Sequence, residues 1–458
     1  MKLLYTEHGE AIMSKNETKS EGSKPSISRR KFLAAGTTAA VAPMVLPSGV
    51  MATKGRAGAN NKLSIGVIGT GGQGTSHLKF LSGRADVHIP AVCDVYKPHL
   101  NRAIDFTGGN AEGYNDYRRL LDRKDLDAVL IASPDHWHGL MTIDAANRGL
   151  DVYCEKPASK TIEEGRAMLK AARRNNIVMQ VGSQGRSTQA AIDSWNYIRN
   201  GQIGDVKKIV CWHEDNRLGG DPSQNQAPPA DLDWDKWLGP AEWRAYNPTM
   251  VPWNFRWMLD FGGGQIRDRG AHVLSVISWI MDLDDCSPVS VSTTADPHVN
   301  GLWDCGTNFR VEFKFKKPDL TIIWEQPGTV PETHNLVDSF HNVFGATYHG
   351  TKGNLIVGGG DGGTFAESQA RNYTPPRNGK HAFESPGHHQ NWFDCIKSRE
   401  KPIMDIAAGH QVCTLCILAN ISYRIGRPVE WDGKRERIKN DHDANRLLGS
   451  PGRGEYHL

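Results

Sequence analysis

The sequence predicts an α/β domain built on a parallel sheet, followed by a strand-rich α+β domain. A Gly-rich turn follows the first apolar run, and short apolar runs then alternate with helical segments as far as residue 181. Repeated βα units of this kind form a doubly wound parallel sheet that helices cover on both faces. From Val206 onward, apolar runs with period-two alternation replace this pattern and helices become fewer, which is typical of an α+β domain.

The elements of the first domain follow one another at short intervals. We expect strands at 63–68, 87–92, 126–132, 151–154 and 177–181, and helices at 117–121, 137–148 and 162–174. In the second domain we expect strands at 206–212, 309–315, 320–324 and 354–357, and a long apolar helix from Asp405 to Tyr423. We place the domain boundaries at 60–185 and 186–440, with a C-terminal tail at 441–458.

Composition and charge are those of a globular protein. Of 458 residues, 38% are hydrophobic and 23% are charged, and the formal net charge is +3. Residues 1–59 hold 9 Lys or Arg and 4 Asp or Glu, which leaves 45 basic and 47 acidic residues in the rest of the chain. Because the positive excess belongs to the N-terminus, we expect no nucleic-acid partner.

Residues 1–59 are predicted to be an export leader. Arg29 and Arg30, followed by Phe32 and Leu33, resemble a twin-arginine signal, and an uncharged stretch continues to Thr53. A disordered basic tail is the alternative. The twin-arginine machinery exports folded proteins, so we expect periplasmic localisation after folding in the cytoplasm. No Cys follows the uncharged stretch and no run is apolar enough for a convincing span, so we expect no stable membrane anchor.

The Gly-rich turn predicts a dinucleotide site. Gly69, Gly71 and Gly74 have the spacing G-x-G-x-x-G between a strand and a helix, and Asp94 ends the next strand 20 residues later. The helix N-terminus offers free N–H groups to phosphates. Asp94 can accept hydrogen bonds from ribose hydroxyls and would repel a 2′-phosphate, which favours NAD over NADP.

Three loops follow the later strands, at the edge where ligands bind in such sheets. They contain Ser133–His138, Glu155-Lys156-Pro157 and Gly182–Arg186. We expect Gln184 and Arg186 to bind substrate hydroxyls. Further on, Asp268 and His272 are spaced i, i+4 on one helix face, where His272 can act as a base for a hydroxyl proton. The eight cysteines show no metal-ligand spacing, so no metal site is predicted.

Together these motifs resemble the glucose–fructose oxidoreductase, inositol dehydrogenase and rhizopine catabolism (Gfo/Idh/MocA) family, over roughly residues 62–435. The resemblance implies a Rossmann domain, a second domain with a large, mostly antiparallel open sheet, and a homodimer or homotetramer. It implies catalytic roles for Lys156, Asp268 and His272, and leaves open whether Lys156 or His272 is the primary proton acceptor. The expected cofactor contacts are Gly69, Thr70, Gly71, Gly72, Gln73, Gly74, Asp94, Ser133, Pro134, His138, Glu155 and Lys156.

Three functions compete on this basis. The first is an NAD(P)-dependent oxidoreductase that acts on a hydroxyl or keto group of a sugar, glycoside or cyclitol, with a cofactor that stays bound and cycles between two substrates. The second is an NAD-dependent glycosidase that works by transient oxidation and elimination. The third is a non-catalytic nucleotide-binding protein. Seven of the 13 Trp lie between 195 and 257, where they could stack on sugar rings or simply cover the sheet.

Overall fold

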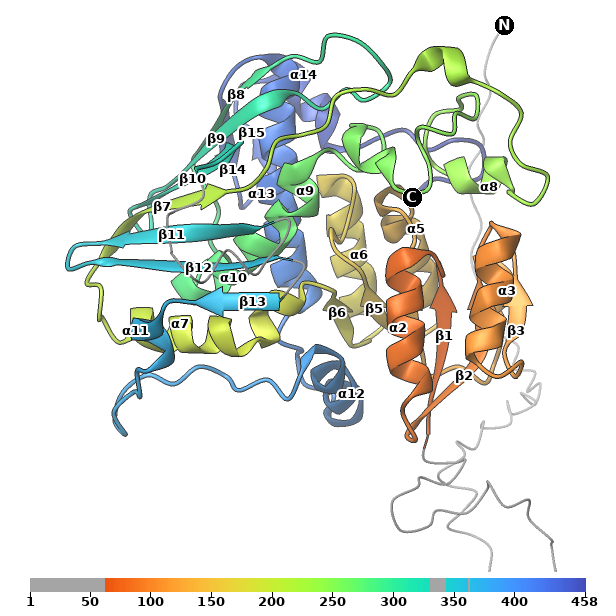
Figure 1. Ribbon diagram of the computed structural model, residues 1–458, viewed down its shortest axis with the longest axis horizontal. Coiled ribbons are helices and arrows are strands. Elements are labelled where there is room, and N and C mark those ends of the chain that lie inside the picture. The colour runs from red at the N-terminus through yellow and green to blue at the C-terminus, as the bar shows by residue number, and fades with distance from the viewer. Residues whose placement is uncertain (1–61, 330–342, 361–362) are drawn as a thin grey trace, which may run out of the picture. The chain divides into compact units, whose positions relative to one another are not determined.

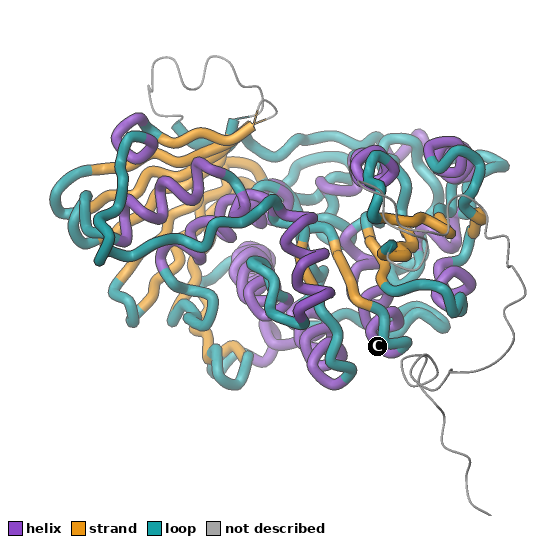
Figure 2. The backbone as a smooth tube through the Cα atoms, turned by 90° about the horizontal axis from the view of Figure 1, so that it is seen from below, coloured by secondary structure: helices purple, strands orange, loops and turns teal. Residues whose placement is uncertain are grey.

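The computed structural model describes residues 62–329, 343–360 and 363–458. These residues belong to one compact unit, Ala52–Leu458. The predicted leader, 1–59, lies outside the described residues. Figure 2 shows the strands of this unit as two separate groups, with helices between and around them.

The first group is a six-stranded sheet in which all strands are parallel, in the order β3-β2-β1-β4-β5-β6. Its strands are β1 (Leu63–Ile68), β2 (Val87–Cys93), β3 (Glu112–Tyr114), β4 (Ala128–Ile131), β5 (Asp151–Cys154) and β6 (Met179–Val181). Its helices are α2 (Gly72–Ser82), α3 (Lys97–Phe106), α4 (Tyr117–Leu121), α5 (Asp135–Asn147) and α6 (Ile162–Arg174). The order reverses between β1 and β4, which opens a crevice at their carboxyl ends.

The parallel sheet separates two apolar layers. Ile65 and Val67 pack with Leu78 of α2, whereas Val129 and Ile131 pack with the core on the other face. Side chains on both faces of the sheet are therefore buried, as expected for a doubly wound parallel sheet that helices cover on both sides. The predicted fold class of this domain is confirmed.

The second group is a nine-stranded sheet in the order β13-β12-β11-β7-β10-β9-β8-β14-β15. Only β7 and β10 pair in parallel, and every other neighbouring pair is antiparallel. The strands are β7 (Val206–Trp212), β8 (Ser290–Asp296), β9 (Thr307–Phe315), β10 (Leu320–Gln326), β11 (Phe344–Gly350), β12 (Asn354–Gly360), β13 (Gly363–Ala366), β14 (Val429–Asp432) and β15 (Arg437–Ile438). This confirms the large, mostly antiparallel sheet.

Helices cover one face of the large sheet. Figure 1 shows α7 (Gln189–Arg199), α10 (Gly270–Met281) and α13 (Ile406–Ile425) on the same side of it. The remaining helices are α8 (Trp234–Leu238), α9 (Gln265–Asp268), α11 (Ser368–Arg371), α12 (His388–Ser398) and α14 (His442–Asn445). In the described part of the chain, α13 is the one helix long and apolar enough to cross a membrane, with mean hydropathy 1.2, and 83% of that window is buried inside the structure.

The last residues, predicted to be a tail, pack against residues of both domains. The ring of Tyr456 lies 5.2 Å from that of Trp137 on α5. Arg453 donates to Asp235 Oδ1 at 2.6 Å and to the carbonyl of Gly239 at 2.9 Å. Residues 441–458 are therefore part of the folded unit, because their aromatic and basic side chains find partners that lie far away in the sequence.

Candidate active site

Two glycines of the Gly-rich turn, Gly69 and Gly74, have no room for a side chain. Gly69 has φ +80°, and a Cβ there would lie 2.5 Å from the amide nitrogen of Ser133. A Cβ on Gly74 would lie 1.9 Å from the carbonyl oxygen of Gly69. Gly72 has open space beside it and lines the pocket, at the first turn of α2, where no side chain caps the helix. Free N–H groups beside open space fit the phosphates of a dinucleotide.

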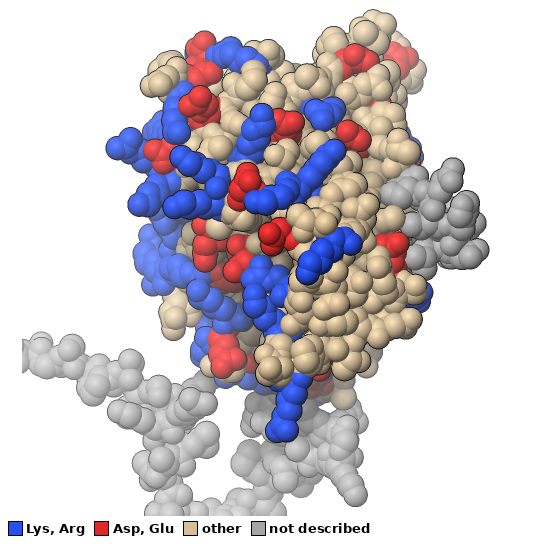
Figure 3. Space-filling model, turned by 90° about the vertical axis from the view of Figure 1, so that its left-hand side faces the viewer, with Lys and Arg blue, Asp and Glu red and all other residues tan. Residues whose placement is uncertain are grey.

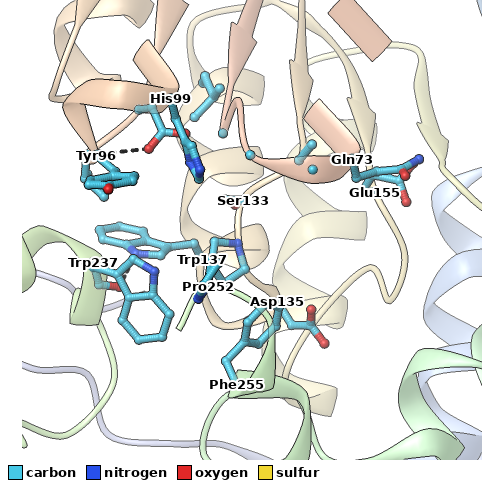
Figure 4. Close-up of a pocket in the computed structure, with 18 of the residues that line it drawn as sticks. Gln73, Tyr96, His99, Ser133, Asp135, Trp137, Glu155, Trp237, Pro252 and Phe255 are labelled. Atoms are coloured by element: carbon cyan, nitrogen blue, oxygen red, sulfur yellow. Dashed lines mark hydrogen bonds and ion pairs between the residues drawn. The ribbon is translucent and has the colours of Figure 1, made fainter. Parts of the chain in front are cut away.

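Asp94 is fixed at the end of β2. Its Oδ2 accepts hydrogen bonds from the N–H (2.8 Å) and the hydroxyl (3.1 Å) of Thr70, and its Oδ1 accepts from the N–H of Tyr96 at 2.9 Å (Figure 4). Thr70 is fully buried and does not line the pocket, and neither does Gly74. Thr70 therefore holds the Asp94 carboxylate and Gly74 shapes the turn, while Asp94 itself lines the pocket.

A cavity of about 720 Å³ lies along the Gly-rich turn. Figure 4 shows its two walls: Tyr96 and His99 on one side, and Trp137, Trp237 and Pro252 on the other. The predicted residues that line it are Gly69, Gly71, Gly72, Gln73, Asp94, Ser133, Pro134, Glu155, Lys156, Gln184, Asp268 and His272. The volume and the two aromatic walls suit an extended ligand with flat rings.

Trp237 and Pro252 of the opposite wall belong to residues 229–253, which we name the cover segment. It meets the loop after β2 in an antiparallel bridge between Tyr96 and Leu232. The N–H of Lys97 donates to the carbonyl of Asp231 at 2.9 Å, and the N–H of Asp233 donates to that of Val95 at 3.0 Å. The backbone of the second domain is thereby joined to the strand end that carries Asp94.

Side chains strengthen the attachment of the cover segment. Both His136 Nε2 and Trp137 Nε1 lie within 3.0 Å of the carbonyl oxygen of Trp237. The rings of Trp234 and Trp237 stack at 4.8 Å and belong to a separate apolar cluster of the segment. The Trp-rich region therefore covers the dinucleotide cleft, whereas the sequence left open whether it meets sugar rings or covers the sheet.

The three predicted catalytic residues meet on one wall of the pocket. Lys156 Nζ lies 2.5 Å from Asp268 Oδ1, and Arg256 Nε lies 3.2 Å from Asp268 Oδ2. Burial acts to raise the pKa of Asp268, but Lys156 and Arg256 outweigh it and hold that pKa well below its usual range. Asp268 is therefore a fixed anion that positions two cations beside the open space.

His272 is one turn further along, in α10. Burial and the charge of Lys156 lower its pKa to about 3, although the charges of Asp268 and Glu155 oppose this. His272 is therefore a neutral imidazole at neutral pH, with a lone pair that can accept a proton. Its ring stacks on that of Phe344, 5.8 Å between centroids, which fixes its orientation.

The structure does not bring Arg186, which we expected to bind substrate, to the pocket. Its side chain is fully buried, and its two terminal nitrogens each lie 2.7 Å from a carboxylate oxygen of Asp284. It does not line the pocket. The guanidinium turns away from the strand end because a buried charge requires a partner, and Asp284 supplies it.

The structure does not bring His138 to the pocket either. Its Nδ1 lies 2.8 Å from the carbonyl oxygen of Pro157, and its Nε2 lies 2.8 Å from that of Ser133. Burial acts to lower its pKa, but Cys154, Asp135 and the carbonyl of Pro157 raise it to about 10, so the ring can donate at both nitrogens. His138 therefore ties together the loops that present Ser133 and Lys156, without a direct contact to the cavity.

Sequence reasoning missed Arg256 and the aromatic walls. Arg256 lies 3.8 Å above the ring of Trp253 and lines the pocket beside Asp268. The only signal in the sequence was the density of Trp and Arg before the Gly-rich stretch 262–264. Among the described residues, no three His, Cys, Asp or Glu side chains are grouped so that they could hold a metal ion.

The fold and the pocket define a two-domain protein with a dinucleotide cleft between a parallel sheet and an antiparallel one. The chain belongs to the Gfo/Idh/MocA oxidoreductase family. Residues 63–183 match the family model for the NAD-binding Rossmann fold, and residues 207–335 and 356–458 match the model for the C-terminal alpha/beta domain. The predicted family and the predicted cofactor, NAD, are confirmed.

Several curated proteins are similar to the chain. Inositol 2-dehydrogenase of Salmonella typhimurium is 31% identical over 33% of this chain and 46% of its own length. A glycosyl hydrolase family 109 protein of Stenotrophomonas maltophilia is 30% identical over 43% of this chain and 45% of its own. Rhizopine catabolism protein MocA of Rhizobium meliloti is 26% identical over 48% and 57%. The matches thus span about half the length of these relatives.

Solved structures share the fold at lower identity. The WlbA dehydrogenase of Bordetella pertussis, in complex with NADH and UDP-GlcNAcA, is 19% identical with a TM-score of 0.57 over 81% of this chain and 99% of that one. Levoglucosan dehydrogenase, in complex with NADH and levoglucosan, is 19% identical with a TM-score of 0.56 over 81% and 99%.

Proposed function

We propose that the protein is an NAD-dependent oxidoreductase that oxidises a secondary hydroxyl, or reduces the matching keto group, of a sugar, glycoside or cyclitol. The observation that carries the proposal is the group formed by Lys156, Asp268 and His272 on the wall of a pocket that also contains the Gly-rich turn. Relatives named as inositol 2-dehydrogenase and rhizopine catabolism protein support this substrate class.

The side chains divide the work of hydroxyl oxidation. When bound, NAD supplies the acceptor for the hydride of the carbinol carbon. The ammonium of Lys156, held by Asp268, donates a hydrogen bond to the substrate oxygen and stabilises negative charge as its proton leaves. The neutral imidazole of His272 is the group on this wall that can accept that proton. We therefore assign the acceptor role to His272 and the electrostatic role to Lys156.

The test is NADH formation by the full chain with a panel of sugars, glycosides and inositols. Against a responsive substrate, Lys156→Met should lower kcat/KM by about 1,000-fold, close to 4 kcal/mol, while NAD binding changes little. Lys170→Met, on the exposed side of α6, is the matched control and should keep full activity. No NADH from any member of the panel would refute the proposal.

An NAD-dependent glycosidase is the second candidate, and the glycosyl hydrolase family 109 relative favours it. Such an enzyme oxidises and then reduces its substrate on the same cofactor, so NADH does not accumulate. Release of nitrophenol from chromogenic glycosides without net NADH would select this reaction over the dehydrogenase.

We also propose that the cofactor stays bound between turnovers. The cover segment supports this, because it joins the far wall of the cleft to the Asp94 strand end through backbone hydrogen bonds. In this proposal these bonds slow the release of a dinucleotide. Protein that is dialysed extensively and then denatured should therefore release NAD or NADH, and a dinucleotide-free supernatant would contradict retention.

The localisation that we propose is the periplasm. Its support is the Arg29-Arg30 motif and the uncharged stretch after it, which lie outside the described residues. A homodimer or homotetramer also stays a proposal, and the exposed face of the large sheet supports it.

A further inference from the structure

A half-exposed tryptophan lies at the rim of the pocket, close to the catalytic group. Trp253 lines the cavity, yet 54% of its surface is exposed to solvent. Its neighbour Pro252 belongs to the wall opposite Tyr96 and His99 in Figure 4. A side chain that both lines a cavity and reaches solvent forms its rim, where part of a ligand can extend outward. An aromatic ring at such a place is a typical ligand contact.

One face of the Trp253 ring is already occupied. The guanidinium carbon of Arg256 lies 3.8 Å from the centre of that ring, and Arg256 Nη1 donates to the Trp253 carbonyl at 3.0 Å. The same guanidinium lies 4.9 Å from the ring of Phe255, and its Nε donates to Asp268 Oδ2 at 3.2 Å. Arg256 is thus held from several sides, and its contact with the indole fixes the plane of that ring.

The opposite face of the ring is open. Because Arg256 covers one face, the exposed area of Trp253 belongs mainly to the other. Neither Trp253 Nε1 nor Arg256 Nη2 has a hydrogen-bond partner among the described residues. A sugar ring matches such a surface, because its C–H groups pack against the negative face of an aromatic ring and its hydroxyls accept hydrogen bonds from N–H groups.

The open face lies next to the reacting centre and not at it. One guanidinium separates the indole of Trp253 from Asp268, whose other carboxylate oxygen holds Lys156 Nζ at 2.5 Å. A sugar whose hydroxyl reaches Lys156 would therefore carry its neighbouring ring to Trp253. A substrate with a single ring would leave this surface uncovered.

We propose that Trp253 is the platform of a second sugar subsite, so that the substrate is a disaccharide or longer glycoside and not a free monosaccharide or cyclitol. The inference rests on the proposed function, in which Lys156 and His272 act on a hydroxyl of the first ring. The second ring packs on the open face of the indole, and its hydroxyls accept from Trp253 Nε1 and Arg256 Nη2. Since this ring does not contact the reacting atoms, its binding affects KM and not kcat.

The first measurement is binding, which needs no turnover. The NAD-loaded full chain is titrated calorimetrically with maltose, cellobiose, lactose and chitobiose, and with the methyl glycosides of glucose, galactose and N-acetylglucosamine as one-ring counterparts. At least one disaccharide should bind about tenfold or more tightly than its counterpart. Trp253→Ala should remove that difference, and Trp253→Phe, which keeps a ring, should restore part of it.

The control and the contrary outcomes use the same titration. Phe383→Ala should keep the preference for two rings, because Phe383 is also 54% exposed but does not line the pocket. Equal affinity for one and two rings in the wild type would overturn the subsite. So would a gain confined to nitrophenyl glycosides, which would assign Trp253 to an aromatic aglycone. A parallel loss of NAD affinity in Trp253→Ala would assign the ring to the cofactor and would also overturn it.

Turnover separates this inference from the proposed function. With a responsive disaccharide, Trp253→Ala should raise KM about tenfold and leave kcat within about twofold, whereas neither constant should change much for the methyl glycoside. An equal fall of kcat for both ligands would overturn the subsite, since Trp253 would then only position Arg256 at Asp268. If the disaccharides bind as expected but no NADH forms, the proposed oxidation fails and the subsite is retained.

Discussion

At the residue scale, the Gly-rich turn depends on contacts that leave no space for one methyl group. Because a Cβ on Gly74 would lie 1.9 Å from the carbonyl oxygen of Gly69, Gly74→Ala should displace α2 from β1 and destabilise the fold by roughly 1–3 kcal/mol. NAD affinity should fall with it. Thermal unfolding and NAD titration are the measurements.

The matched control for that substitution lies at the other end of the same helix. A Cβ on Gly83 would meet nothing closer than 3.6 Å, and its φ is −74°. Gly83→Ala should therefore leave both the melting temperature and NAD binding close to wild type. A Gly74→Ala protein with the same stability as Gly83→Ala would show that the turn tolerates a side chain.

The sequence predicted the role of a residue where an ionisable side chain follows a strand or lies on a helix face that the fold brings to the cleft. Lys156, Asp268 and His272 were identified because a strand end and a helix face bring ionisable groups to a dinucleotide cleft. Arg186 and His138 occupy similar positions, but their side chains turn inward to buried partners. Which way a side chain turns depends on contacts with residues far away in the sequence, and no local pattern encodes it.

At the element scale, α12 begins with a buried histidine that makes the fold sensitive to acid. His388 Nε2 donates to the carbonyl of Val181 at 2.9 Å, and its Nδ1 accepts from the hydroxyl of Ser187 at 2.9 Å. Burial lowers the pKa of His388 to about 4, although the Val181 carbonyl opposes this. In the unfolded chain the pKa is about 6.5.

This difference sets the direction of the pH dependence. As pH falls from about 6.5 to about 4, the unfolded chain binds a proton that the folded protein does not, so stability is lost in that window. His388 alone should contribute about 2 kcal/mol of that loss between pH 7 and pH 5. Denaturant unfolding of His388→Gln should show a flatter pH profile than the wild type or His442→Gln, whose side chain is 90% exposed. An unchanged slope would refute the assignment.

The elements themselves were predicted with different success. Five of the six strands of the parallel sheet, and α6, appear where apolar periodicity predicts them. The short strand β3 (Glu112–Tyr114) was not predicted, because Glu-Gly-Tyr has no apolar run. The cover segment could not be placed, since its Pro- and Asp-rich sequence has no period. Its position comes from the Tyr96–Leu232 bridge and from the contact of Trp237 with His136 of the first domain, both of which join residues far apart in the sequence.

At the scale of the whole molecule, one face of the large sheet has no helix over it in the described structure. On β9, Arg310 and Lys314 are exposed while Val311 and Phe313 are buried. Figure 3 shows the side of the molecule where this sheet lies, with Lys, Arg, Asp and Glu mixed over part of it and an uncharged area beside them. We expect a second copy of the chain to cover this face.

A row of side chains across five paired strands gives the test. Thr347, Val210 and Ile323 lie in register on neighbouring strands, between Ile356 and Glu312. Val210→Glu together with Thr347→Glu should convert a dimer or tetramer into a smaller species, measured by light scattering, because charges would oppose each other across the interface. Lys170→Glu on α6 is the control. An assembly unaffected by the double change must use another surface.

Export and cofactor retention make one joint prediction for the whole chain. If Arg29 and Arg30 direct a folded protein across the membrane, the dinucleotide must enter before the cover segment meets the Asp94 strand end, because NAD is made in the cytoplasm. Chain recovered from the periplasm should therefore contain bound NAD or NADH, quantified after denaturation. Arg29→Lys with Arg30→Lys should keep the same cofactor-loaded protein inside the cell, while Lys15→Arg should not. Exported chain without a dinucleotide would support export but contradict cofactor loading before export. The protein would then bind its cofactor outside the cytoplasm.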